Sequence, residues 1–65
     1  MEKKHQEIAR QITKFAHALA IHYNRGELSR DGYYRSLIGQ AVSVGAKDSD
    51  KMHEYIREKF VPEIA

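Results

Sequence analysis

Histidine and carboxylate side chains are the residues of this chain that could ligate a metal ion. His17 and His22 fall in one predicted helix, with Glu27 shortly after it. Two histidines on one helix share an ion when they are four residues apart, because that spacing puts both on the same face. His17 and His22 are five residues apart and therefore point about 140° away from each other. His5 and His53 are remote from both. We expect no metal site and no cofactor.

Nucleophilic and acid–base catalysis also lack the residues that they need. The sequence has no cysteine, no Gly-x-Ser-x-Gly nucleophile turn and no glycine-rich phosphate loop. No two carboxylates share an apolar face, where burial could separate their pKa values. A chain of 65 residues also offers little concavity for a substrate pocket. We therefore expect a protein that is not an enzyme and that takes no small-molecule substrate.

The composition predicts one small domain over residues 1–65, with 42% hydrophobic and 31% charged residues. Such a short chain buries only ~60% of the surface that its unfolded form exposes, so self-association would add stability that it needs. No apolar run approaches the ~20 residues that span a bilayer, and the first residues lack the apolar stretch of a signal peptide. We expect a cytoplasmic protein that does not enter a membrane.

Glycines and helix-capping residues divide the chain into three predicted helices. Gly26 suits the left-handed position that ends a helix, and Gly45 marks a second helix end. Ser29 suits an N-cap, the third helix starts at Asp48 or Ser49, and Pro62 follows it. The three predicted helices cover about residues 3–25, 30–44 and 49–60. The expected fold class is therefore all-α, a small three-helix domain with a long first helix that could be oligomeric.

The first predicted helix has one broad apolar face. Ile8, Ile12, Phe15 and Leu19 follow one another at spacings of four, three and four residues. With the neighbouring alanines, this face covers roughly 160° of the helix, more than a two-stranded coiled coil needs. We expect it to pack against two neighbours. Because this helix is also the longest, its first turns should overhang its partners unless a second subunit covers them.

The opposite face of the first helix carries a row of cations in a chain whose net charge is +2. We define the cationic face as Lys3, Arg10, Lys14, His17 and Arg25. These side chains could neutralise nucleic-acid phosphates or meet an acidic protein, and salt would weaken either contact. They could also be merely solvated. Ile21 lies in the middle of this face, either as a stray surface residue or as a contact for a partner.

The outward side of the second predicted helix is unusual because it is almost uncharged. We define the small-residue strip as Ser36, Gly39, Gln40 and Ser43, with Arg35 at its edge. Glycine inside a helix costs about 1 kcal/mol relative to alanine, so Gly39 requires a reason. Close approach of another backbone would supply one, and relief of crowding inside the monomer is the alternative.

Two modes of nucleic-acid recognition fit the sequence poorly. In a helix-turn-helix, the spacing of Ala41 and Gly45 would put Lys51 in the core and acids toward the phosphates. Stacking of single-stranded bases would need exposed aromatic rings. Helical spacing instead predicts core positions for all the aromatic residues, Tyr55 included, except Tyr33, which is expected at the margin.

These patterns favour a non-catalytic interaction module that binds another protein, or itself in a homodimer, by packing helix against helix. The small-residue strip would allow close approach, while Arg10, Lys14 and Arg35 would orient the partner electrostatically. The alternative is a nucleic-acid-binding regulator that uses the cationic face. Contact with nucleic acid would then go through the phosphate backbone, with little base specificity.

Replacing Gly39 with leucine tests the small-residue strip. We expect Gly39→Leu to disrupt association, because a bulky side chain would hold a second backbone away, while helical content stays largely intact. Light scattering coupled to size-exclusion chromatography would follow the molar mass, and circular dichroism would follow the helices. Unchanged mass together with unchanged partner binding would exclude the strip as a contact.

Overall fold

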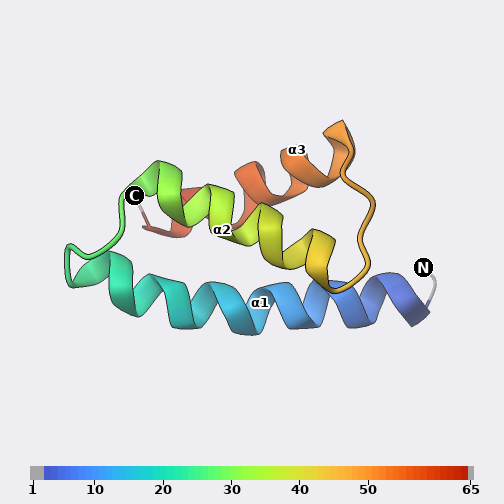
Figure 1. Ribbon diagram of the computed structural model, residues 1–65, viewed down its shortest axis with the longest axis horizontal. Helices are drawn as coiled ribbons and strands as arrows, with labels where there is room; N and C mark the ends of the chain where they lie inside the picture. The colour runs from blue at the N-terminus through green and yellow to red at the C-terminus, as the bar shows by residue number, and fades with distance from the viewer. Residues whose placement is uncertain (1–2, 65) are drawn as a thin grey trace.

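The computed structural model describes residues 3–64 and contains three α-helices followed by a short 3-10 helix (Figure 1). The elements are α1 (Lys3–Asn24), α2 (Arg30–Ser43), α3 (Asp50–Lys59) and η1 (Val61–Ile64). No strand occurs within residues 3–64. The predicted all-α class, with three helices of which the first is the longest, is confirmed. Over the same residues, no helix combines the length and the apolar character that a membrane crossing requires.

Serine side chains start both α2 and α3. The Ser29 hydroxyl accepts a hydrogen bond from the backbone N–H of Gly32 at 3.0 Å. The Ser49 hydroxyl accepts one from the backbone N–H of Met52 at 3.4 Å. Each bond satisfies an N–H group that has no acceptor inside its helix. Ser29 is the predicted N-cap of α2. For α3, where the sequence leaves Asp48 and Ser49 open as the start, the N-cap is Ser49.

Glycines in the left-handed region end α1 and α2. Gly26 has φ of 77°, and its N–H donates to the carbonyl of Tyr23 at 3.0 Å. The N–H of Glu27 donates to the carbonyl of His22 at 3.0 Å, which completes a Schellman motif. Gly45, with φ of 107°, ends α2 with the same pair of bonds. These residues need glycine because a Cβ is disfavoured at such φ values.

α2 is the central element of the fold. It packs against α1 on one side and against α3 and η1 on the other, whereas α1 and α3 share no comparable contact. Figure 1 shows α1, in blue and cyan, running along α2, while α3, in orange and red, lies on the far side of α2. The first turns of α1 extend past the end of α2, as the lengths of the helices predict. The molecule is elongated, with extents of 36 × 20 × 18 Å.

Among residues 3–64, seven hydrophobic side chains form the buried core. They are Ile12, Ala16, Tyr33, Leu37, Ala41, Ile56 and Phe60. α2 supplies three of them at four-residue spacing, so one face of this helix is fully covered. Burial of each large side chain contributes about 1.5–3 kcal/mol to folding. The core therefore depends on α2 more than on either neighbour.

Two tyrosines lie where the sequence does not place them. Tyr33, predicted at the margin, is only 2% exposed, because it shares the buried face of α2 with Leu37 and Ala41. Tyr55, predicted in the core, is 37% exposed. It lies on the side of α3 that faces α1, and α2 holds these two helices apart.

Burial changes the acid–base behaviour of Tyr33. The loss of hydration disfavours the phenolate and raises the pKa of Tyr33 above its ordinary value of about 10. The negative charge of Glu63 in η1 acts in the same direction, because it repels the phenolate. The folded chain therefore holds this proton more tightly than the unfolded chain does.

Stability should fall as pH rises through the range in which Tyr33 titrates. The stabilisation from its retained proton is complete below the unfolded pKa and is lost as pH rises through the higher folded pKa. Urea unfolding at a series of pH values between about 9 and about 11 should show a steeper loss for the wild type than for Tyr33→Phe. The comparison with Tyr33→Phe isolates the contribution of the Tyr33 hydroxyl. If the free energy of unfolding fell equally with pH in the wild type and in Tyr33→Phe, this expectation would be contradicted.

Candidate binding groove

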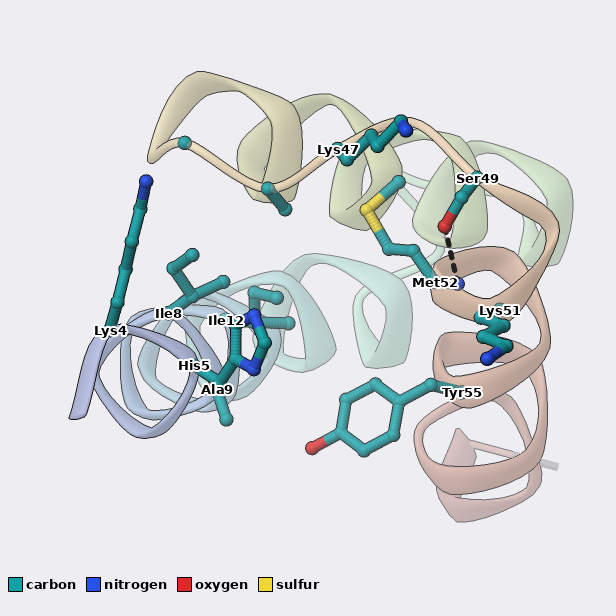
Figure 2. A pocket seen from close by; sticks show the side chains of 12 residues that line it. Lys4, His5, Ile8, Ala9, Ile12, Lys47, Ser49, Lys51, Met52 and Tyr55 are labelled. Atoms are coloured by element: carbon teal, nitrogen blue, oxygen red, sulfur yellow. Dashed lines mark hydrogen bonds between the residues drawn. The ribbon is translucent and has the colours of Figure 1, made fainter. Parts of the chain in front are cut away.

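A groove opens between the N-terminal half of α1 and α3 (Figure 2). Its volume is about 600 Å³, within the range of about 300–1,000 Å³ that is typical of ligand sites. The connection between α2 and α3 runs along one side of it. The groove exists because α1 and α3 both pack on α2 and leave a gap between them.

The floor of the groove is apolar and comes from two helices. α1 contributes Ile8, Ala9 and Ile12, while α3 contributes Met52 and Tyr55. Ile8 and Ile12 are one helical turn apart, as are Met52 and Tyr55, so each pair forms a ridge along its helix. Figure 2 shows the Tyr55 ring pointing across the groove toward α1. Two parallel apolar ridges therefore face an open space.

Basic side chains surround this apolar floor. We define the cationic rim as Lys4 of α1, Lys47 of the connection and Lys51 of α3; His5 also lines the groove. Among residues 3–64, no Asp or Glu lines it. The ion pairs formed among residues 3–64 do not involve any lysine of the rim. The groove therefore combines an apolar floor with a positive edge.

Acidic residues near the groove in sequence face the other side of α3. A second, polar depression there is lined by His53 and Arg57 together with Asp48, Asp50, Glu54 and Glu58. Ser49 alone lines both depressions. α3 thus separates a positive, apolar surface from a polar one rich in carboxylates.

A chain of hydrogen bonds fixes the connection that carries Lys47. The ring of His53 lies 2.7 Å from the Asp48 carboxylate through Nε2 and 2.7 Å from the Tyr34 hydroxyl through Nδ1. Because a carboxylate only accepts, Nε2–H donates to Asp48, and in the neutral ring Nδ1 accepts from Tyr34. Arg57 also donates to the Tyr34 oxygen, at 3.4 Å. These bonds tie the connection to α3 and α3 to α2.

Phe60 and Lys59, at the C-terminal end of α3, hold the Tyr55 side chain in place. Its ring meets Phe60 edge to face, with centroids 6.0 Å apart and an interplanar angle of 83°. The Nζ atom of Lys59 donates to the Tyr55 hydroxyl at 3.1 Å and lies 5.4 Å from the ring centroid. One wall of the groove is therefore preformed rather than created when a ligand binds.

The small-residue strip of α2 is only partly accessible. Ser43 is exposed, whereas Ser36 and Gln40 are half-buried. Arg35 is exposed and forms a 2.8 Å ion pair with Asp31 one turn earlier. None of these residues lines the groove. A partner contact through the strip stays a prediction.

Gly39 is exposed, and its surroundings exclude relief of crowding inside the monomer as the reason for a glycine there. A Cβ built on Gly39 would have no neighbouring atom within 4 Å. Crowding within the chain therefore does not require glycine at this position. Val42, three residues further along α2, is 44% exposed. Leucine at position 39 would fit the monomer, so the Gly39→Leu variant reports on association rather than on folding.

The cationic face is solvent-exposed at every position: Lys3, Arg10, Lys14 and His17 of α1, and Arg25 just after it. Arg10 pairs with Glu7 on the same helix. Ile21 is 54% exposed. None of these residues lines the groove, which opens on the apolar side of α1. Sequence reasoning therefore missed the groove, and the predicted overhang of α1 was the signal that could have located it.

Neither the ionisable residues nor known proteins identify a function directly. Within the part of the chain that the structure describes, no group of three or more His, Asp or Glu side chains is placed to hold a metal ion. Comparisons with protein-family models, curated proteins and solved structures found no match. What this chain binds has to be inferred from the groove itself.

Alanine substitutions at two glycines should change stability in opposite directions. We expect Gly39→Ala to stabilise the fold by about 1 kcal/mol, because the site is helical and open. Gly26→Ala should destabilise it by about 1–2 kcal/mol, because its φ of 77° disfavours a Cβ. Urea unfolding followed by circular dichroism measures both. A destabilised Gly39→Ala monomer would show that neighbouring atoms crowd a Cβ at position 39.

Proposed function

We propose that this chain is a non-catalytic interaction module that binds an amphipathic helix of a partner protein in the groove between α1 and α3. The observation that carries the proposal is the uncovered apolar floor between the two ridges. Ile8, Met52 and Tyr55 stay partly accessible there. Isolated exposed apolar residues are common, but a shared concave surface from two helices indicates a binding site.

A helix suits this groove because of its spacing. The two ridges repeat at one helical turn, and the side-chain ridge of a third helix packs into the depression between two such rows. The apolar face of α1, about 160° wide, suits two neighbours. α2 is one of them. The groove is where the second would lie.

The described chain does not fill the groove itself. Within residues 3–64, η1 is the only element after α3, and it packs against α2 and α3. None of its residues lines the groove. The wall is held by the Asp48–His53–Tyr34 hydrogen bonds and by the packing of Tyr55. A preformed wall reduces the ordering that binding requires, which favours affinity.

Synthetic helices test this proposal without knowledge of the natural partner. The probes are stapled peptides of about 15 residues, long enough for roughly four turns. They share one apolar ridge and carry Glu, Gln or Lys on the polar face. We expect at least one of them to bind and to shift the amide resonances of Ile8, Ile12 and Met52 in nitrogen-15 spectra.

Two isoleucines of α1 provide a matched pair of variants. Ile8→Asp places a charge in the groove, so binding should fall at least about tenfold. Ile21→Asp places the same charge on the opposite face of α1 and should leave binding unchanged, because Ile21 is 54% exposed. Circular dichroism checks that both variants keep their helices. Failure of all three peptides to bind, or equal loss in both variants, would exclude the groove as the site.

A further inference from the structure

We propose that the partner helix is acidic, with Asp or Glu on both flanks of its apolar ridge, and that the cationic rim selects it. This inference rests on the proposed function and adds the chemistry of the partner. The rim lysines come from three separate segments: Lys4 from α1, Lys47 from the connection and Lys51 from α3. They therefore border the apolar floor from more than one side (Figure 2).

The charge around the groove is one-sided. A docked helix with carboxylates beside its ridge would find a cation on each flank, and no Asp or Glu of residues 3–64 lines the groove. A helix with lysines in the same places would meet like charges, which is unfavourable at an interface. The rim therefore distinguishes partners by charge, while the floor supplies apolar contact area.

Lys51 is placed against the local preference of its own helix. It lies in the first turn of α3, where the positive end of the helix dipole favours acids and disfavours cations. No ion pair among residues 3–64 offsets this charge. Lys47 likewise has no acidic partner within the described chain. A residue that breaks a local rule without a compensating contact indicates a functional constraint.

Lys4 has an additional structural role, which makes it a poor test residue. Its Cε atom lies 3.9 Å from the position of a Cβ on Gly45, at the end of α2. The last turn of α2 has no basic residue of its own, and a cation near the end of a helix is favourable. Substituting Lys4 would therefore disturb both the fold and the rim. Lys47 and Lys51 can be changed without this complication.

The same charges argue against a second copy as the occupant. A two-fold dimer centred on the groove would bring the rim lysines of both copies together, because an isologous interface places the same patch on both sides. Like charges facing each other oppose such an interface. An acidic helix from another protein removes this repulsion and pairs the lysines.

Fluorescence anisotropy with the Glu, Gln and Lys peptides tests the inference. We expect the Glu peptide to bind about tenfold more tightly than the Gln peptide, and the Lys peptide to bind most weakly. Raising salt from about 50 mM to about 500 mM should reduce these differences, because the rim is exposed. Generic duplex DNA serves as a polyanion that has no apolar ridge.

Charge reversal provides the decisive variant. The double substitution Lys47→Glu with Lys51→Glu should invert the order, so that the Lys peptide binds best. An acid at position 51 suits the start of α3, so the fold should be retained. The matched control is Lys3→Glu with Lys14→Glu on the cationic face, away from the groove. It should leave the order of the three peptides unchanged.

The outcomes separate the two proposals. Equal binding of the three peptides would overturn the acidic partner and leave the proposed function standing. No binding by any peptide would overturn both. DNA that binds as tightly as the Glu peptide, and loses affinity in the Lys47 and Lys51 variant, would also overturn the inference, because the rim would then be a general polyanion site. If the protein forms a dimer and the Glu peptide dissociates it, the inference would also be overturned, because a second copy would then be the occupant of the groove.

Discussion

The rest of the structure depends on the packing of α2 between its two neighbours. Leu37 and Ala41 are fully buried, so this helix has no accessible surface on its inner face. Its contacts with α1 on one side and α3 on the other keep those two helices apart. A domain of three helices cannot cover every apolar side chain when one of them is central and the longest lies at the edge. The groove is the consequence of this arrangement.

Short-range hydrogen bonds decide where the wall of the groove lies. The Schellman motif at Gly45 turns the chain out of α2, and the Ser49 cap starts α3 four residues later. Between them, Asp48 is bound by His53, which also binds Tyr34. Such bonds cost little entropy because their partners are close in sequence or already packed. They hold Lys47 beside an apolar floor without any large core beneath it.

Charge is distributed around α3 in a way that the net value of +2 does not reveal. Cations border the groove, and carboxylates line the depression on the other side of the same helix. Helical periodicity produces this separation, because adjacent residues of a helix point about 100° away from each other. Asp50 and Lys51, adjacent in sequence, therefore contribute to different surfaces. A binding preference can arise from such local patterning in a chain of moderate overall charge.

The sequence by itself determined the three helices and their ends, because glycine conformation and serine caps act within a few residues of Gly26, Ser29 and Gly45. It also placed the cationic face on the solvent side of α1. Only the tertiary structure decided that Tyr33 is buried, that Tyr55 faces a groove, and that nothing crowds Gly39. Helical periodicity states which residues share a face, but it does not state which neighbour covers that face. The packing of α1 and α3 on α2 settles that question.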